Sequence, residues 1–246
     1  ERERKREKEK ERKIRERERE CVWEREKEKE GKREKEGNKG RKRKGSHKER
    51  FEMVEKLLVL IIGDMHVPHR AATLPPKFKK MLVPGKIQHV ICTGNLCTKE
   101  MHDYLRTVAS DVHVVCGDFD ENKAFPEVKV VKIGGFSFGI VHGHQVVPWG
   151  DPEALAIYQR QLDVDILVSG HTHTLDIHTK DSKLFLNPGS ATGAYSGFSS
   201  DILPSFILLD IEEEKQNVIA FSYQLKSSLI VDKYEWGKGN ANCTKS

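Results

Sequence analysis

The chain has 246 residues, with 43 Lys and Arg against 38 Asp and Glu, which gives a formal net charge of +5. Residues 1–50 hold 24 of the basic groups and 15 Glu, so residues 51–246 are net acidic, with 19 basic and 23 acidic groups. The positive charge therefore belongs to one terminal segment, which argues against a basic nucleic-acid-binding domain. No stretch approaches the ~18 apolar residues of a membrane-spanning helix.

The first predicted segment, residues 1–52, is a low-complexity charged tail. Glu, Arg and Lys fill it up to Gly31, and Val22 and Trp23 are almost its only apolar residues, so it cannot bury enough surface to fold. Two structures compete for it: a solvated single helix supported by i,i+4 ion pairs, or disorder. A third hypothesis is that the tail is a translated purine-rich repeat, with Met53 as the native start.

The predicted domain, residues 53–234, begins with a β-α-β-α-β pattern. Three apolar runs predict strands buried on both faces: Leu57–Ile62, Val90–Cys92 and Val112–Cys116. Two stretches between them carry apolar residues at helical spacing: Pro75–Leu82 and Lys99–Val108. This order favours parallel strands with right-handed crossovers.

The later part of the domain is richer in strands. A hairpin is expected from Val128–Ile133 and Phe136–Val141 around two glycines, followed by a helix at Pro152–Leu162. Short strands complete the domain: Asp165–Val168, Leu175–Thr179, Leu184–Leu186, Ser205–Asp210, Val218–Leu225 and Leu229–Lys233. We expect an α/β fold of two packed sheets with helices outside, followed by a flexible tail at residues 235–246.

Polar side chains of metal-ligand type follow five of the predicted strands. They are Asp64, His66, Asn95, Asp118, His142, His171 and His173. Ligand sites of α/β sheets gather outside the carboxyl ends of the strands. Mixed Asp, Asn and His ligation suits Zn²⁺, Mn²⁺ or Fe better than Ca²⁺ or Mg²⁺. The sequence therefore predicts one two-metal site at an edge of the sheets.

The cysteines point to a reducing compartment. Their number is odd: Cys21, Cys92, Cys97, Cys116 and Cys243. Cys92 and Cys116 fall within predicted strands, and the spacing of Cys92 and Cys97 suits neither a zinc ribbon nor a redox pair. We therefore expect a cytoplasmic protein.

The order of the ligand motifs resembles that of the calcineurin-like metallophosphoesterases, from about Leu57 to Leu225. The motifs are Asp64-Met65-His66, Gly94-Asn95, Gly117-Asp118, His142-Gly143-His144 and Gly170-His171-Thr172-His173. The resemblance implies a four-layer α-β-β-α sandwich. It also implies two divalent metals such as Zn²⁺ or Mn²⁺. One would be held by Asp64, His66 and His173, the other by Asp118, His142 and His171, with Asn95 between them.

Three positions depart from the pattern of active family members. The bridging Asp is Asn95, the Asn of the next motif is Asp118, and the following His is Phe119. The first two changes exchange one carboxylate for another, so metal binding is expected, with weaker affinity. Phe119 can donate no proton, and general acid–base help is worth about 10²–10⁴ in rate. We therefore expect no catalytic residue; an active phosphodiesterase or phosphatase is the alternative.

Longer motifs, such as Gly63–Arg70 and Asn187–Ala194, are similar to those of one branch of the family, the small subunits of retromer. This similarity implies a scaffold in endosome-to-Golgi and recycling transport, cytoplasmic and peripheral on endosomal membranes. Its metal-site face would dock on the large α-solenoid subunit. Phe119, Val147 and Trp149 are the expected contacts, because interface anchors are typically aromatic.

A second surface also follows from the resemblance. Its members are Leu58, Leu82, Leu208 and Tyr223, at positions that form an apolar patch for regulatory proteins. Ordinary core packing is the alternative for these four. A third functional hypothesis assigns the basic run Arg41–Lys44 to membrane or nucleic-acid binding, against a simple solvated charge run.

Overall fold

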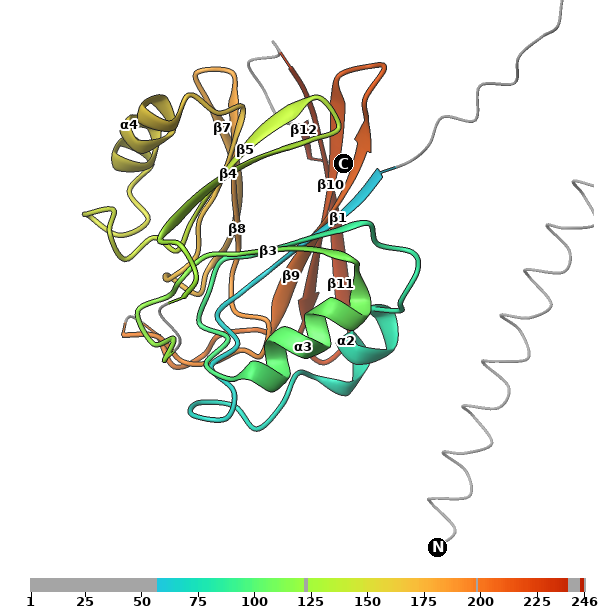
Figure 1. Cartoon of the computed structure of the whole chain (residues 1–246), viewed down its shortest axis with the longest axis vertical. Helices are drawn as coiled ribbons and strands as arrows, with labels where there is room; N and C mark the ends of the chain where they lie inside the picture. Colours follow the sequence, from blue (N-terminus) through green and yellow to red (C-terminus); the bar gives the residue numbers. More distant parts are fainter. Residues whose placement is uncertain (1–56, 122–123, 198, 239–243, 246) are drawn as a thin grey trace, which may run out of the picture. The chain divides into compact units, whose positions relative to one another are not determined.

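The structure is a computed structural model of the chain that describes residues 57–121, 124–197, 199–238 and 244–245 (Figure 1). The charged tail expected at residues 1–52 lies outside the described residues. None of the helices in these ranges has the length and apolar character needed to cross a membrane.

Every predicted helix and strand of the domain is present. In chain order the elements are β1 (Leu57–Ile62), α2 (Pro76–Met81), β2 (His89–Cys92), α3 (Lys99–Val108), β3 (Asp111–Val114), β4 (Val128–Ile133), β5 (Phe136–Val141), α4 (Pro152–Leu162), β6 (Ile166–Val168), β7 (Leu175–Lys180), β8 (Lys183–Pro188), β9 (Ser205–Glu212), β10 (Asn217–Leu225), β11 (Leu229–Gly237) and β12 (Thr244–Lys245). β3 ends at Val114, before the expected Cys116, whose N–H donates to Pro126 O at 2.8 Å.

The first sheet has the strand order β12-β11-β10-β9-β1-β2-β3. β1 pairs in parallel with β2 and β2 with β3, which confirms the predicted parallel unit. β9 then runs antiparallel to β1, and β10 and β11 follow antiparallel. The apolar run of β1 contributes to two cores, because successive side chains of a strand point to opposite faces of the sheet. Val59 and Ile61 face the second sheet, whereas Leu60 and Ile62 face α2 and α3.

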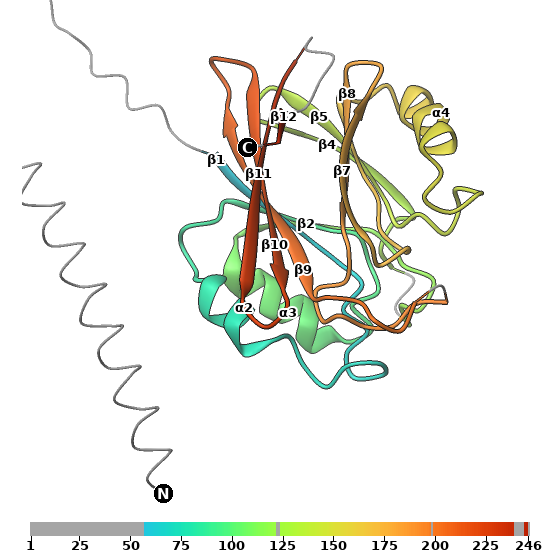
Figure 2. The ribbon, with the colours of Figure 1, turned by 180° about the vertical axis from the view of Figure 1, so that it is seen from behind.

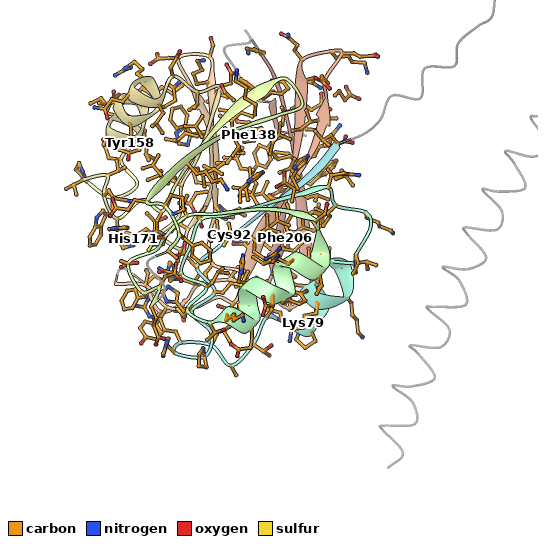
Figure 3. All side chains as sticks on the ribbon, in the orientation of Figure 1. Lys79, Cys92, Phe138, Tyr158, His171 and Phe206 are labelled. Carbon is orange, nitrogen blue, oxygen red and sulfur yellow. The ribbon has the colours of Figure 1, made fainter. Side chains whose placement is uncertain are left out.

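The second sheet has the order β4-β5-β6-β8-β7, and it packs face to face with the first (Figures 1 and 2). α2 and α3 cover the outer face of the first sheet, and α4 covers the outer face of the second. Figure 3 shows Phe138 between the sheets and Phe206 beneath the helices of the first sheet. The expected four-layer α-β-β-α sandwich is confirmed.

The expected flexible C-terminal tail at residues 235–246 is wrong in its first part. β11 continues to Gly237, and Trp236 is only 2% exposed. The indole packs 5.7 Å from the Phe136 ring, in the core between the sheets. Burying a large side chain stabilises a fold by about 1.5–3 kcal/mol, enough to order the end of a strand. Farther on, β12 pairs with β11.

Candidate metal centre

All seven predicted ligands lie in loops that follow the carboxyl ends of β1, β2, β3, β5 and β6. β1, β2 and β3 are parallel to one another, and β5 is parallel to β6, so within each sheet these ends meet at one edge. The structure brings the side chains together as two groups of three with Asn95 between them. We call them the first trio (Asp64, His66 and His173) and the second trio (Asp118, His142 and His171).

The loops hold these residues in an unusual backbone conformation. Asp64, His66, Asn95, His171 and His173 all have positive φ, between 47° and 70°. Non-glycine residues rarely adopt this region, and such conformations persist at functional sites where surrounding contacts enforce them. Here the enforcing contacts include hydrogen bonds from Asp64 N to Gly94 O at 3.1 Å and from His66 N to Asn95 O at 2.9 Å.

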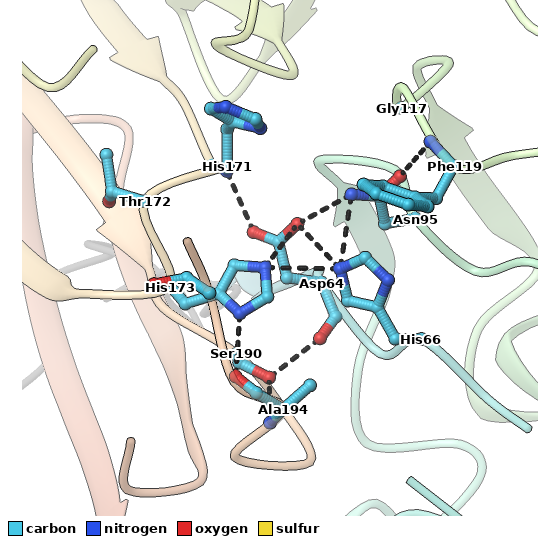
Figure 4. A network of polar contacts seen from close by, with 12 residues as sticks. Asp64, His66, Asn95, Gly117, Phe119, His171, Thr172, His173, Ser190 and Ala194 are labelled. Carbon is cyan, nitrogen blue, oxygen red and sulfur yellow. Dashed lines mark hydrogen bonds and ion pairs between the residues drawn. The ribbon is translucent and has the colours of Figure 1, made fainter. Parts of the chain in front are cut away.

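The first trio is completely buried, with each residue at most 3% exposed. The Nε2 atoms of His66 and His173 lie 3.1 Å apart, and His173 Nε2 is 3.6 Å from Asp64 Oδ1 (Figure 4). His173 Nδ1 donates to Ala194 O at 2.7 Å, which leaves the Nε2 lone pair facing the trio. The other carboxylate oxygen of Asp64 accepts from His171 N at 2.9 Å.

The second trio is more open, because the side chain of Asp118 is 28% exposed. Asp118 Oδ1 lies 2.9 Å from His142 Nε2 and 3.8 Å from His171 Nδ1. His142 Nδ1 donates to Thr93 O at 2.6 Å, which orients Nε2 toward the carboxylate. A backbone carbonyl therefore sets the ring of one histidine in each trio, the arrangement common among metal-bound imidazoles.

Burial and charge shift the titration of both trios. Burial, followed by the nearby Arg70 cation, lowers the pKa of His66 from 6.5 to about 3. Burial acts to raise the pKa of Asp118, but hydrogen bonds from His142, His171 and Asn95 outweigh it and hold that pKa far below its ordinary value. At neutral pH the centre therefore offers a neutral His66 and an ionised Asp118.

The side-chain nitrogen of Asn95 lies where the trios meet. Nδ2 is within 3.3 Å of a carboxylate oxygen and an imidazole nitrogen from each trio. Its oxygen, Oδ1, accepts from Phe119 N at 2.9 Å. A Cβ on Gly117 would lie 2.1 Å from this oxygen, so only glycine allows the approach.

The donor set fits divalent transition-metal ions. Within each trio the ligand atoms lie within 4.8 Å of one another. The Nε2 atoms of His66 and His173 converge beside Asp64 Oδ1, and carboxylate with imidazole is the ligand type of Zn²⁺ and Mn²⁺. Two buried atoms nearby, His66 Nδ1 and Thr93 Oγ1, have no hydrogen-bond partner among the described residues.

Asp120 is a site residue that motif matching did not single out. Its carboxylate is 4% exposed and accepts from the backbone N–H groups of Asn95, Cys97 and Gly117 at 2.8–2.9 Å. It thereby fixes the loops after β2 and β3 to each other. Its place next to Phe119, in the loop that follows β3, was the available signal.

Of the predicted contact residues, Phe119 and Trp149 line the opening of the centre, and Val147 lies two residues before Trp149 in the same loop. Phe119 is 50% exposed, Val147 74% and Trp149 47%, and we call these three the rim. The Trp149 ring lies 4.5 Å from the His171 ring, and the Phe119 ring lies 5.3 Å from that of His66. A cavity of about 250 Å³ opens between Phe119 and Trp149, and Arg70 lines it too.

The predicted apolar patch lies on the helix-covered face of the first sheet. Leu208 pairs with Leu60 across β1 and β9, and the Tyr223 ring stacks on Phe206 at 4.7 Å. Leu58, Leu208 and Tyr223 are partly buried, but Leu82 is only 4% exposed and belongs to the core beneath α2.

Two further histidines lie apart from the centre. His89 Nδ1 and His113 Nε2 contact Asp111 Oδ2 at 2.7 and 3.0 Å, at the starts of β2 and β3. They form a group with Asp111 that is separate from the seven predicted ligands.

Comparison with known proteins gives the family. Residues 57–214 match the model of the calcineurin-like phosphoesterase superfamily domain. The vacuolar protein sorting-associated protein 29 of Schizosaccharomyces pombe is 45% identical over 160 residues, which span 63% of this chain and 86% of that protein.

Two solved structures agree with this match. Vps29 of Entamoeba histolytica complexed with Zn²⁺ is 54% identical, covers 73% of this chain and 99% of its own, and superposes with a TM-score of 0.69. Vps29 of Cryptosporidium parvum is 43% identical, with coverages of 74% and 99% and a TM-score of 0.71. The chain therefore belongs to the calcineurin-like phosphoesterase superfamily and, within it, to the Vps29 family.

Proposed function

We propose that the protein is a non-catalytic scaffold subunit of retromer, acting in endosome-to-Golgi and endosomal recycling transport. It would be cytoplasmic and peripheral on endosomal membranes, held there through the complex. The observation that carries the non-catalytic part is Phe119. Its ring lies 5.3 Å from His66 at the opening of the centre, and it has no proton to donate to a leaving group.

His144, a histidine near the second trio, does not replace that function. His144 lies 5.4 Å from the His142 ring and 6.2 Å from the His171 ring, on the side of the second trio. Burial, followed by the charge of His142, lowers its pKa, so it is neutral and a poor acid at pH 7. The absence of a general acid at Phe119 therefore favours a scaffold function over catalysis.

A metal-dependent phosphodiesterase is the second candidate. The two trios and the Arg70 cation at the cavity favour it. When bound, divalent ions would supply Lewis acidity toward a phosphoryl oxygen. Asp64, His66 and His173 would hold one Zn²⁺ or Mn²⁺, and Asp118, His142 and His171 a second; the zinc-bound Entamoeba relative supports this assignment.

The rim is the proposed docking surface for the large α-solenoid subunit. Its three side chains, Phe119, Val147 and Trp149, are large, apolar and about half exposed or more. Exposed apolar surface often marks an interaction site, and aromatic side chains commonly anchor interfaces. Regulatory proteins are proposed to bind the second surface through Leu58, Leu208 and Tyr223, with Leu82 supporting it from beneath.

Affinity purification of the full chain from cells, followed by mass spectrometry, tests the proposal. Stoichiometric capture of an α-solenoid retromer subunit supports the scaffold function. Capture without that subunit, combined with metal-dependent phosphodiester turnover by the purified chain, would support the enzyme instead.

A further inference from the structure

A second cluster of metal-ligand side chains lies on the first sheet, apart from the two trios. Its members are His89 at the start of β2 and Asp111 and His113 on β3. His89 and Asp111 are partners in the parallel register of the two strands, and His113 follows Asp111 by two residues. Because side chains two residues apart on a strand point to the same face, this pairing brings the three side chains together on one face of the sheet.

That face of the sheet is apolar farther along. Val90 and Val112, the next residues on each strand, pack in the core beneath α2 and α3, so the cluster points to the opposite face, toward the second sheet. On the same face of β2, Ile91 belongs to the core between the sheets. β3 is the last strand of the first sheet, so the cluster lies beside this core at the edge of the sandwich. Packing beside an apolar core does not account for two imidazoles and a carboxylate.

The three side chains converge on one point. His89 Nδ1 lies 2.7 Å and His113 Nε2 lies 3.0 Å from the same oxygen, Asp111 Oδ2. The two imidazole rings are almost parallel, with an interplanar angle of 13° and centroids 6.2 Å apart. Zinc bonds of about 2.0–2.1 Å in a tetrahedral arrangement place neighbouring ligand atoms about 3.3 Å apart. Small side-chain shifts would therefore let the cluster hold a Zn²⁺ ion.

The cluster is reachable from solvent, and its imidazoles are held by the fold. The side chain of Asp111 is 48% exposed, whereas those of His89 and His113 are 23% and 13% exposed. Burial lowers the pKa of His113; the Asp111 carboxylate opposes this shift and the Lys129 cation adds to it. Lys129 would repel a bound ion, but it also helps to keep His113 in the neutral form that binds metals.

We propose that His89, Asp111 and His113 form a further binding site for one divalent transition-metal ion such as Zn²⁺, separate from the two trios. Three protein ligands leave a tetrahedral ion one position open to solvent. The ion would join the start of β2 to the edge strand β3. The competing interpretation is a hydrogen-bonded clamp, in which Asp111 accepts from both imidazoles. The inference depends neither on the scaffold function nor on metal binding by the trios.

Equilibrium dialysis of the full chain against about 10 µM free Zn²⁺, followed by metal analysis, tests the site. His113→Gln is the decisive variant, because a glutamine amide can still donate to Asp111 but is a poor zinc ligand. It should bind about one equivalent of Zn²⁺ less than the parent chain. Binding equal to that of the parent would show a hydrogen-bonded clamp and overturn the proposal.

His178→Gln is the matched control for this measurement. His178 Nδ1 faces Asp176 Oδ2 at 2.6 Å, but the pair belongs to no group of three ligands among the described residues. This variant should bind as much Zn²⁺ as the parent. The same loss in both variants would mean that isolated pairs of His and Asp take up the ion, and it too would overturn the proposal.

A second measurement needs no variant. In NMR spectra of the histidine ring nitrogens, Zn²⁺ should shift the signals of His89 Nδ1 and His113 Nε2, the atoms that face Asp111, and leave those of His178 in place. Unshifted His89 and His113 signals at a Zn²⁺ concentration that shifts those of the trios would contradict the site. Neither experiment includes the partner subunit, so failure of this proposal would leave the scaffold function standing.

Discussion

The guanidinium carbon of Arg70 lies 4.3 Å from the centroid of the Phe119 ring, in a cation–π contact at the opening of the metal centre. The same group lies 4.8 Å from the Tyr195 ring and donates from Nη1 to Tyr195 O at 2.8 Å. Such contacts contribute about 0.5–1 kcal/mol at exposed sites. A cation that could attract a phosphate is thus engaged with two aromatic rings, and the contact holds Phe119 in a defined position.

Replacing Phe119 tests the pseudo-enzyme assignment directly. With saturating Mn²⁺, Phe119→His should raise turnover of a generic phosphodiester by about 10²–10⁴ over the parent chain, because it restores a proton donor beside His66. Phe119→Leu should stay at the parent level. Robust turnover by the parent that disappears in Asp118→Ala would contradict the scaffold assignment.

Removing the indole of Trp149 tests the rim as a docking surface. Trp149→Ala should weaken capture of the α-solenoid subunit by roughly tenfold or more, the scale of an interface hot spot, while the melting temperature changes little. Ile157 is a matched control, because it is 51% exposed on α4 and lies outside the rim. Equal capture by Trp149→Ala and Ile157→Ala would remove Trp149 from the interface.

Substituting Asp120 should disturb the centre without removing a predicted ligand. An asparagine there would turn an NH₂ group toward one of the backbone N–H groups that the carboxylate now accepts. We expect Asp120→Asn to lower the free energy of unfolding by about 1–3 kcal/mol in urea titrations. Glu121→Gln, at a position 79% exposed, should change it by less than about 0.5 kcal/mol.

Asp165 gives a prediction for the pH dependence of stability. Burial acts to raise its pKa, but hydrogen bonds from Lys238, Ser137 and Lys183 outweigh it and hold the pKa below the ordinary 3.8. A depressed carboxyl pKa adds stability above pH 3.8, which is lost as the pH falls through the folded value. Asp165→Asn should therefore destabilise the protein at pH 7 and less so at pH 2, measured by urea unfolding.

The control for this prediction is a surface ion pair. Asp181 contacts Arg160 at 3.2 Å, with both side chains more than half exposed. Such pairs contribute about 0–1 kcal/mol, so Asp181→Asn should have a small effect that varies little with pH. If Asp165→Asn lowers the free energy of unfolding equally at pH 7 and pH 2, then packing of Asp165, rather than its charge, accounts for its contribution to stability.

The buried end of β11 makes a prediction about the domain boundary. Trp236→Ala should lower the free energy of unfolding by about 3–5 kcal/mol, because it leaves a cavity between the sheets beside Phe136. Truncating the chain after residue 234 should lower the free energy of unfolding by at least the same amount. Cooperative unfolding of the truncated chain at the parent midpoint would contradict the assignment of this segment to the core.

The sequence predicts the helices and strands of this protein better than it predicts which residues near their ends are buried. The strands and helices were predictable because hydrophobic periodicity reports them directly, as in β1, whose side chains alternate between two cores. The end of β11 was not predicted, because Tyr234 and Trp236 alternate with charged residues. This alternation belongs to a strand with one buried face, but in the sequence it resembled a polar tail. From the sequence Leu82 could equally be surface or core, and only the packing of the C-terminal end of α2 on the first sheet places it in the core.

The sequence by itself determined which residue types follow the strand ends, and so the family and the departures at Asn95, Asp118 and Phe119. It could not show which atom of Asn95 faces the trios, because that depends on the Phe119 N–H, which comes from another loop. Nor could it show that Asp120 fixes three backbone N–H groups or that Arg70 packs on Phe119. Residue types and spacing are local properties, whereas the orientation of a side chain depends on contacts that exist only after the strands have paired and brought distant loops together.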